Sequence, residues 1–276
     1  MLMSDVKYSV LMSVYFKENP LYLYQSIESM VKQTVKPDEI IIVKDGPLTE
    51  ELESTLKEFG DTGILNVITL KENKGLGKAL EIGLERCRNN FVARMDTDDI
   101  SKKDRCEKQL SYLKSNPNTS LVGSNIAEFS NNINKILSKR IVPTKDINIK
   151  KTMKTKSPFN HPSVMFRKDK VIESGSYKEW YLNEDYYLWV RMLINGCEFG
   201  NIDEELLYMR VNDDTFQRRG GWAYFMTQKR LFDFMLKNKV ISIPTYIYNN
   251  VTRIIVRLML PNKIRAILYK KLLREN

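Results

Sequence analysis

The chain has 276 residues, 42% of them hydrophobic, which is enough to bury a sizeable core in one large domain with or without an appendage. Its three cysteines, Cys87, Cys106 and Cys197, lie far apart without C-x-x-C spacing, which argues against a disulfide framework or a zinc site and fits a reducing cytosol. Because neither a signal peptide nor a run of roughly 18 apolar residues is evident, we expect a soluble or peripheral protein.

The net charge of +10 is unevenly distributed along the chain. Residues 221–276 have 11 Lys and Arg against 2 acidic residues, or +9, whereas residues 1–220 have 33 against 32, or +1. This asymmetry predicts a near-neutral body and a basic C-terminal region that meets an anionic surface; the alternative is a basic face that is merely solvated. Nucleic-acid binders spread basic residues over a recognition face, so nucleic acid is not expected as a partner.

The first hundred residues alternate strand patterns with helix patterns. Apolar runs predict strands at residues 8–15, 39–46, 65–70 and 91–95. Helical spacing predicts helices at residues 20–32 and 49–59, the second with Thr49 as its N-cap. A third helix is predicted within residues 73–87, after a turn that contains glycines. Such alternation implies a parallel sheet with crossover helices, which binds ligands at the carboxyl ends of its strands. Polar residues follow these strands, namely Tyr15, Asp45, Asn73 with Lys74, and Asp96 with Asp98.

The pattern after Asp99 is more mixed. We expect helices at residues 103–115 and about 185–195, and strands at 120–129, 161–167 and 205–211, which would complete the sheet with antiparallel strands. From residue 221 the pattern is helical and basic, with Ile243-Pro244 between two helices. The sequence therefore predicts an α/β domain at residues 1–220 and a basic amphipathic helical extension at 221–276.

Three aspartates, Asp96, Asp98 and Asp99, stand within four positions directly behind the fourth predicted strand. Their mutual repulsion would be relieved by a cation, and hard oxygen ligands suit Mg²⁺ or Mn²⁺, which keep open positions for substrate phosphates. The alternative is that Asp98 or Asp99 caps the helix predicted near Lys103. Because three carboxylates exceed what a cap requires, a site for a metal and a diphosphate is the favoured interpretation.

Four sequence blocks, SVYFKE, IIVKDG, NKGLGKALEIGL and ARMDTDD, resemble in order and spacing the donor-binding half of inverting family 2 glycosyltransferases with the GT-A fold, over about residues 8–211. Downstream, NHPSVMFRK, LNEDYYLWVRM and YMRVNDDTFQRRGGW resemble the bacterial exopolysaccharide and O-antigen branch, near the amylovoran-biosynthesis type. The resemblance implies a Rossmann-like mixed sheet flanked by helices. It also implies transfer of one sugar, galactose, glucose or an N-acetylhexosamine, from a UDP-sugar to a lipid-linked oligosaccharide during synthesis of capsule, exopolysaccharide or O-antigen.

The resemblance assigns donor-site roles to residues of the four blocks. Asp45 would accept a hydrogen bond from the uracil ring, Asp98 would coordinate the metal, and Asp96 would hold the ribose or a metal-bound water. Asp99 would act as support. Lys44 stands where the family often has a second aspartate, which leaves Asp45 alone in its role. The remaining positions assigned to the nucleotide-sugar are Val14, Tyr15, Glu18, Lys74, Arg94 and Thr97.

A second acidic pair, Glu184-Asp185, opens a predicted helix. A sugar hydroxyl that attacks an anomeric carbon needs a base on the face opposite the leaving nucleotide. The resemblance assigns this role to Asp185. The alternative is that both acids only stabilise the helix N-terminus electrostatically.

Two further features are candidates for the diphosphate or acceptor side. His161, the only histidine, is expected to be structural or to lie near the acceptor rather than to act as a base. Arg210, Arg218 and Arg219 precede a Gly-Gly pair and are expected to form a flexible loop that closes over the diphosphate; the alternative is an exposed basic turn.

The C-terminal segment NNVTRIIVRLMLPNKIRAILYKKLL alternates apolar clusters with Arg and Lys at helical spacing. Such a helix can lie on an anionic leaflet, which suits a polyprenyl-diphosphate acceptor and a peripheral enzyme on the cytoplasmic face of the bacterial inner membrane. The alternative is a helix that packs its apolar face on the domain itself. Other functions considered are a nucleotidyltransferase, disfavoured because no Gly-rich loop follows the first strand, and a module that only binds anionic surfaces.

Overall fold

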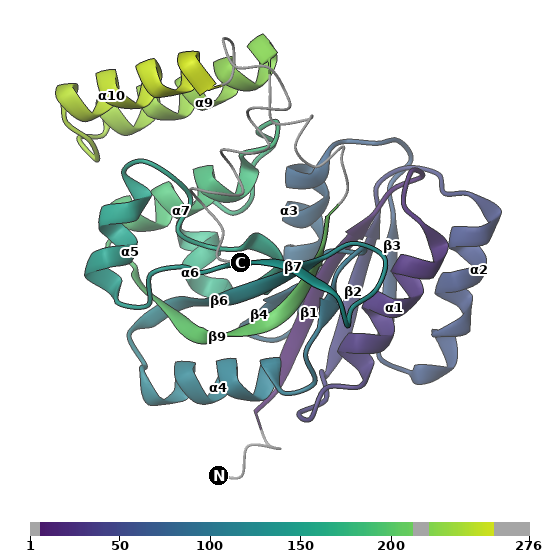
Figure 1. Ribbon diagram of the computed structural model, residues 1–276. Coiled ribbons are helices and arrows are strands. Elements are labelled where there is room, and N and C mark those ends of the chain that lie inside the picture. Colours follow the sequence, from purple (N-terminus) through teal and green to yellow (C-terminus); the bar gives the residue numbers. More distant parts are fainter. Residues whose placement is uncertain (1–5, 212–220, 257–276) are drawn as a thin grey trace.

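The computed structural model describes residues 6–211 and 221–256 of the chain. Within these residues the strands form one nine-stranded sheet in the order β3-β2-β1-β4-β8-β6-β9-β5, with β7 paired to β6 (Figure 1). Helices flank both faces of the sheet. This mixed α/β architecture confirms the fold class predicted from the sequence.

The N-terminal half supplies parallel strands and the helices that connect them. The strands are β1 (Tyr8–Val14), β2 (Glu39–Lys44), β3 (Leu65–Thr69) and β4 (Phe91–Arg94), and the helices are α1 (Pro20–Val31), α2 (Glu50–Glu58) and α3 (Leu76–Arg86). β1 pairs in parallel with β2 and β4, and β2 pairs in parallel with β3. Thr49 caps α2 as predicted, since its side chain accepts a hydrogen bond from the Leu52 amide.

The second half completes the sheet with strands of both directions. Its elements are β5 (Ile100–Ser101), α4 (Arg105–Ser115), β6 (Thr119–Phe129), β7 (Ile136–Arg140), α5 (Asp146–Met153), β8 (Met165–Arg167), α6 (Lys168–Glu173), α7 (Glu184–Ile194) and β9 (Glu198–Arg210). β8 is antiparallel to β4 and β6, whereas β6 and β9 are parallel. The strand predicted at residues 161–167 is wrong in its first half, because His161–Ser163 forms a 3₁₀ turn around Pro162, which has no amide hydrogen for a ladder.

Successive residues of β1 point into two different cores, as the two-residue period of a strand requires. Leu11 packs in one core with Leu80 of α3 and Trp189 of α7, while Val10 and Met12 belong to the other. The first core also receives side chains from α5 and α6, and the second receives them from α1, α2 and α4. β1 is therefore covered on both faces, which explains its continuous apolar sequence.

Two helices follow residue 220, α9 (Gly221–Lys237) and α10 (Ile243–Ile254), and α10 lies along α9 (Figure 1). Leu231, Phe232 and Met235 of α9 are completely buried in the same core as α7. The predicted domain boundary at residue 220 stays a prediction. None of the helices within residues 6–211 and 221–256 is both long enough and apolar enough to cross a membrane.

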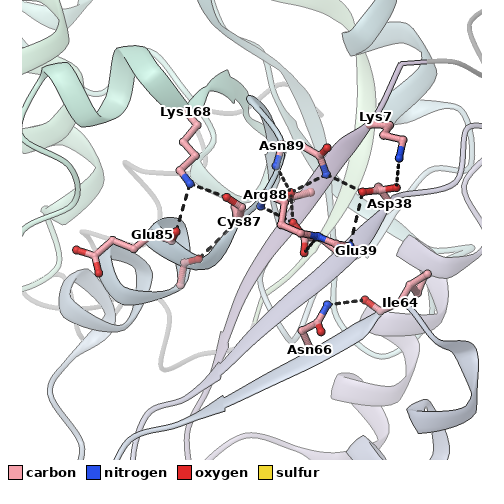
Figure 2. A network of polar contacts seen from close by, with 12 residues as sticks. Lys7, Asp38, Glu39, Ile64, Asn66, Glu85, Cys87, Arg88, Asn89 and Lys168 are labelled. Atoms are coloured by element: carbon pink, nitrogen blue, oxygen red, sulfur yellow. Dashed lines mark hydrogen bonds and ion pairs between the residues drawn. The ribbon is translucent and has the colours of Figure 1, made fainter.

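A polar network closes the edge of the sheet at which β1 and β2 begin (Figure 2). The buried carboxylate of Glu39 accepts hydrogen bonds from the Ser9 hydroxyl at 2.6 Å and from the amide and Nε of Arg88 at 2.6 and 2.9 Å. Asn89 donates to both Ser9 and Asp38. These contacts fasten the C-terminal end of α3 to the sheet and leave the opposite, carboxyl edge for ligands.

Candidate active site

The carboxyl ends of β1, β2 and β4 bring the predicted donor-site segments to one edge of the sheet. Val14 lies opposite Lys44 in the β1–β2 register, and the Asp45 amide donates to the Val14 carbonyl at 2.8 Å. Tyr15 and Glu18 form the turn that follows, in which the Glu18 amide donates to the Tyr15 carbonyl at 3.1 Å. Because β4 lies on the other side of β1, the aspartates that follow β4 share this edge.

Asp45 is a buried carboxylate, 4% exposed, that joins the ends of β2 and β3. Its two oxygens accept the amides of Lys74 at 2.7 Å and Gly75 at 3.1 Å. Gly46 completes this turn with φ +91°, and a Cβ there would lie 2.9 Å from the Asn73 nitrogen, so only glycine fits. Each carboxylate oxygen has a second lone pair, so Asp45 keeps acceptor capacity for a donor group of a bound base.

The two lysines of this region differ in their partners. Lys44 forms an ion pair with Glu53, and its side chain is 13% exposed, so it faces α2. The Lys74 ammonium lies 3.8 Å from Glu72, and its side chain is 46% exposed. Lys74 is therefore the cation of this pair that is accessible to a phosphate.

The three aspartates after β4 form a compact cluster. Asp96, Asp98 and Asp99 each offer one carboxylate oxygen, and these oxygens lie within 4.8 Å of one another. Burial and the charge of Asp96 raise the pKa of Asp98 to about 6. Burial, followed by the charges of Asp98 and Asp96, raises the pKa of Asp99 well above its ordinary value. A divalent cation would relieve this repulsion, and oxygen ligands are those that Mg²⁺ and Mn²⁺ prefer, so the residues present fit such an ion.

The alternative that Asp98 or Asp99 caps the next helix is wrong. The strand β5 intervenes, and α4 begins at Arg105 with Asp104 at its N-cap position. Instead, Asp99 is 2% exposed and accepts a hydrogen bond from the Arg210 amide at 2.8 Å.

Arg210 fastens the aspartate loop to the end of β9. Its Nε donates to the Asp98 carbonyl at 3.0 Å, and its two terminal nitrogens donate to the Ser130 carbonyl and to Gln25. The guanidinium also lies 3.7 Å from the ring centroid of Tyr22. Arg210 is predicted to belong to a loop that closes over the diphosphate. In the structure its guanidinium is engaged in hydrogen bonds within the protein. Its two predicted companions, Arg218 and Arg219, lie outside the described residues.

Arg94 places a buried positive charge at the base of the site. Its side chain is 1% exposed, forms an ion pair with Asp96, and leaves Nε without a hydrogen-bond partner. The Asp96 carbonyl is held from α1 by the Ser26 hydroxyl at 2.6 Å. Thr97 is buried between the aspartates. Arg94 thus contacts an aspartate directly, while its predicted contact with the nucleotide or sugar stays a prediction.

Glu184 and Asp185 occupy the first turn of α7, which begins two residues after Leu182, whose φ of +57° is strained. Burial and the charge of Asp185 raise the pKa of Glu184 to about 8. This shift favours the protonated form of Glu184 near neutral pH, and a neutral neighbour suits the predicted role of Asp185 as a base.

His161 and Tyr177 contact each other, and the charges of both acidic regions act on Tyr177. His161 Nε2 lies 3.1 Å from the Tyr177 hydroxyl, and burial followed by the charge of Arg94 holds the pKa of His161 well below its ordinary value. Burial raises the pKa of Tyr177, and the charges of Asp185, Glu184 and Asp96 act in the same direction while that of Arg94 opposes them. His161 is thus a neutral side chain packed against Tyr177 and Trp189, and its predicted role stays a prediction.

Three residues near the site were not identified from the sequence. Tyr177 has a pKa that responds to the charges of both acidic regions, and Glu179 accepts a hydrogen bond from the Gly77 amide at the start of α3 at 3.1 Å. Thr227 of α9 accepts hydrogen bonds from Trp180 and Asn183, just before the acidic pair. Each belongs to a contact between distant segments, and no local motif marks it.

Comparison with known proteins gives a consistent result. The model of the family described as "Glycosyl transferase family 2" matches residues 9–175. The UDP-Gal:alpha-D-GlcNAc-diphosphoundecaprenol beta-1,3-galactosyltransferase of Escherichia coli is 39% identical over 98% of this chain and 97% of its own length. The amylovoran biosynthesis glycosyltransferase AmsE of Erwinia amylovora is 40% identical over 96% of this chain and 98% of its own length.

Among solved structures, residues 1–349 of S. aureus TarS in complex with UDP-GlcNAc match with a TM-score of 0.66. The identity is 17%, and the match covers 84% of this chain and 67% of that one. At this identity the likeness shows the fold alone. That fold is of the GT-A type, with a mixed sheet flanked by helices, as predicted from the sequence blocks.

Proposed function

Because the chain belongs to glycosyl transferase family 2 and is therefore a glycosyltransferase, we propose that it moves a single sugar from a UDP-sugar to a polyprenyl-diphosphate-linked glycan with inversion at the anomeric carbon. Galactose, glucose and the N-acetylhexosamines are the candidate sugars, and the product would enter a surface polysaccharide such as capsule, exopolysaccharide or O-antigen. The observation that carries the proposal is the cluster of three aspartates after β4, whose carboxylate oxygens lie within 4.8 Å of one another at the carboxyl edge of the parallel strands.

The donor would occupy the carboxyl edge of β1, β2 and β4. Asp45 would accept a hydrogen bond from the uracil ring beside Val14, Tyr15 and Glu18, and Lys74 would approach a phosphate. Asp98, helped by Asp96, would hold Mn²⁺ or Mg²⁺. When bound, the ion would neutralise the charge that develops on the departing diphosphate.

Asp185 would act as the base. The acceptor hydroxyl oxygen forms a bond to the anomeric carbon, the bond from that carbon to the diphosphate oxygen breaks, and UDP leaves with the electron pair. The hydroxyl proton passes to the Asp185 carboxylate. Glu184, protonated at pH 7, would hold its place beside Asp185 without a second negative charge. In-line displacement from the face opposite the nucleotide inverts the configuration.

An acceptor of this class is anchored in a membrane, so the enzyme would work as a peripheral protein at the cytoplasmic leaflet of the inner membrane. The E. coli relative, whose name contains both a UDP-sugar and a diphosphoundecaprenol acceptor, aligns over nearly the whole chain and supports this substrate class. Family membership disfavours a nucleotidyltransferase and a module that only binds anionic surfaces.

The test is a transfer assay with UDP-Gal, UDP-Glc, UDP-GalNAc and UDP-GlcNAc, each with Mn²⁺ or Mg²⁺ and a short-chain lipid-diphosphate GlcNAc acceptor. One donor should give a product whose new linkage has the inverted anomeric configuration by NMR, and EDTA should stop the reaction. Binding of UDP without transfer from any of the four donors would contradict the proposed substrates. A product with retained configuration would contradict the proposed displacement.

A further inference from the structure

Helix α10 turns its polar side chains toward the protein. The Tyr246 hydroxyl donates to Asp233 of α9 at 2.6 Å, and Asn249, which is completely buried, donates to the Lys154 carbonyl at 2.9 Å. Arg253 donates to the Thr155 carbonyl and lies over the Phe232 ring. These three side chains follow one another at intervals of three and four residues, so they share one face of the helix.

The opposite face of α10 is apolar and exposed. Ile243 is 65% exposed, Ile247 54% and Val251 48%, and these residues recur every four positions. An apolar groove runs along this face, lined by Ile243, Pro244, Ile247, Tyr248, Val251 and Thr252. A surface helix of a globular protein in water normally has the reverse arrangement, with its apolar stripe facing the core. The exposed face of α10 is therefore suited to a neighbour that is not water.

The charge of the sequence that contains this face indicates the neighbour. No acidic residue occurs between Asp233 and Glu275 in the sequence, a segment that contains Lys237, Lys239, Arg253 and six further Lys and Arg beyond residue 256. An exposed apolar stripe within a basic stretch of sequence that lacks carboxylates matches a lipid surface with anionic headgroups, because apolar burial and electrostatic attraction can then act together. A second copy of the chain would have to bring two such basic regions together.

We propose that the outward face of α10 (the Ile243–Ile247–Val251 face) rests on an anionic lipid leaflet and orients the active site toward it. This inference rests on the proposed function for the identity of the membrane-bound acceptor. Helix α10 lies along α9 (Figure 1), and Thr227 of α9 accepts hydrogen bonds from Trp180 and Asn183, which precede Glu184.

A label at residue 247 tests contact with the leaflet. The full chain with Ile247→Cys would be labelled with an environment-sensitive fluorophore; Cys87, Cys106 and Cys197 are buried. Vesicles of phosphatidylglycerol with phosphatidylcholine should shift the emission to the blue and raise it, as an apolar environment does. The matched control is Val67→Cys on β3, which is exposed like Ile247 but lies on a distant strand. Equal responses at both positions, or none at 247, would overturn the proposal.

Substitution of the face tests its contribution to binding and turnover. Ile243→Ser, Ile247→Ser and Val251→Ser together should reduce sedimentation with these vesicles about tenfold, because three apolar contacts are lost. The control carries serine at Val67, Leu137 and Ile172, which are similarly exposed. The face variant should lose transfer to an acceptor embedded in vesicles and keep transfer to a water-soluble short-chain acceptor, which also shows that it is folded.

The remaining outcomes distinguish the leaflet from other neighbours of the α10 face, and distinguish failure of this proposal from failure of the proposed function. A chain ending at Val256 that binds uncharged vesicles better than the full chain would show that residues 257–276 cover the face, and so would overturn the proposal. A dimer in sedimentation velocity that the face variant converts to a monomer would also overturn it. Vesicle binding that depends on the face, combined with no transfer to either acceptor, would support the leaflet contact and contradict the proposed function instead.

Discussion

The aspartates after β4 and the acidic pair at the start of α7 are held in different ways. The first group has two arginines attached to it, Arg94 at Asp96 and Arg210 at Asp98 and Asp99. The second begins a helix after a residue with positive φ, and burial followed by the charge of Asp185 raises the pKa of Glu184.

This difference shows how a buried negative charge is balanced for two tasks. In the first group Arg94 forms an ion pair with Asp96, whereas the Arg210 guanidinium donates to the Asp98 backbone carbonyl, so a bound cation would offset the negative charge that remains. In the second group the raised pKa of Glu184 favours its protonated form near neutral pH. The first arrangement is suited to binding a metal and a diphosphate, and the second to accepting a proton.

The largest effect on the transfer rate is expected from loss of the proposed base. Asp185→Asn should lower the rate constant for transfer by about a thousandfold, the magnitude typical of general-base loss, and leave UDP affinity unchanged. Calorimetry with UDP and Mn²⁺ and a transfer assay measure the two quantities. Asp203→Asn, a carboxylate on β9, serves as a control. Full transfer by Asp185→Asn would remove this residue from the role of base.

Loss of the metal ligand should affect binding before transfer. Asp98→Asn should weaken UDP binding in the presence of Mn²⁺ by about a hundredfold and leave the weak metal-free binding intact. Asp104→Asn, which removes a surface carboxylate paired with Lys108, is the matched control. Unchanged Mn²⁺-dependent affinity in Asp98→Asn would show that the ion is held elsewhere.

The raised pKa of Asp98 predicts that the stability of the metal-free protein depends on pH. Because its pKa is about 6 in the folded state against 3.8 ordinarily, its contribution to stability is fully present below pH 3.8 and is lost as the pH rises through 6. Between pH 4 and pH 7 the free energy of unfolding of Asp98→Asn should therefore rise by about 1 to 2 kcal/mol relative to that of the parent protein. Mn²⁺ should stabilise only the parent protein. Urea unfolding at the two pH values measures the gain.

Arg210 should influence the first acidic group through its geometry rather than its charge. Arg210→Lys keeps the charge but cannot reach Asp98, Ser130 and Gln25 together, so Mn²⁺ affinity should fall roughly tenfold. The control is Arg167→Lys, because Arg167 likewise donates to two carbonyls and lies over an aromatic ring, away from the aspartates. Equal Mn²⁺ affinities in both variants would contradict a positioning role for Arg210.

The smallest expected effect concerns the proton on Glu184. Glu184→Gln mimics the protonated form, so transfer at pH 7 should change only a few-fold. Above pH 8 the parent protein ionises Glu184, which places a second charge beside Asp185, and its rate profile should depart from that of Glu184→Gln there. Superimposable pH–rate profiles would show that Glu184 does not titrate in this range.

Much of the fold was predictable because its signals are local. The N-terminal strands are apolar runs, and Pro, Asp-Gly and Thr49 mark the ends of the elements between them. The error at residues 161–167 arose where the apolar run Val164 to Phe166 was extended back over Pro162, which favours a turn. Arg210 was identified as important, but its contacts with Asp98 and Asp99 cross more than one hundred residues and have no local signature.

The sequence by itself determined which strands end in carboxylates and amides, because a parallel sheet brings its carboxyl ends to one edge whatever the loops do. It also determined that the excess positive charge lies at the C-terminal end. Only the tertiary structure decided that Arg94 is buried against Asp96, that His161 is neutral beside Tyr177, and that α10 exposes its apolar face. Burial and long-range contacts control pKa values and exposure, and these quantities exist only once distant segments have packed together.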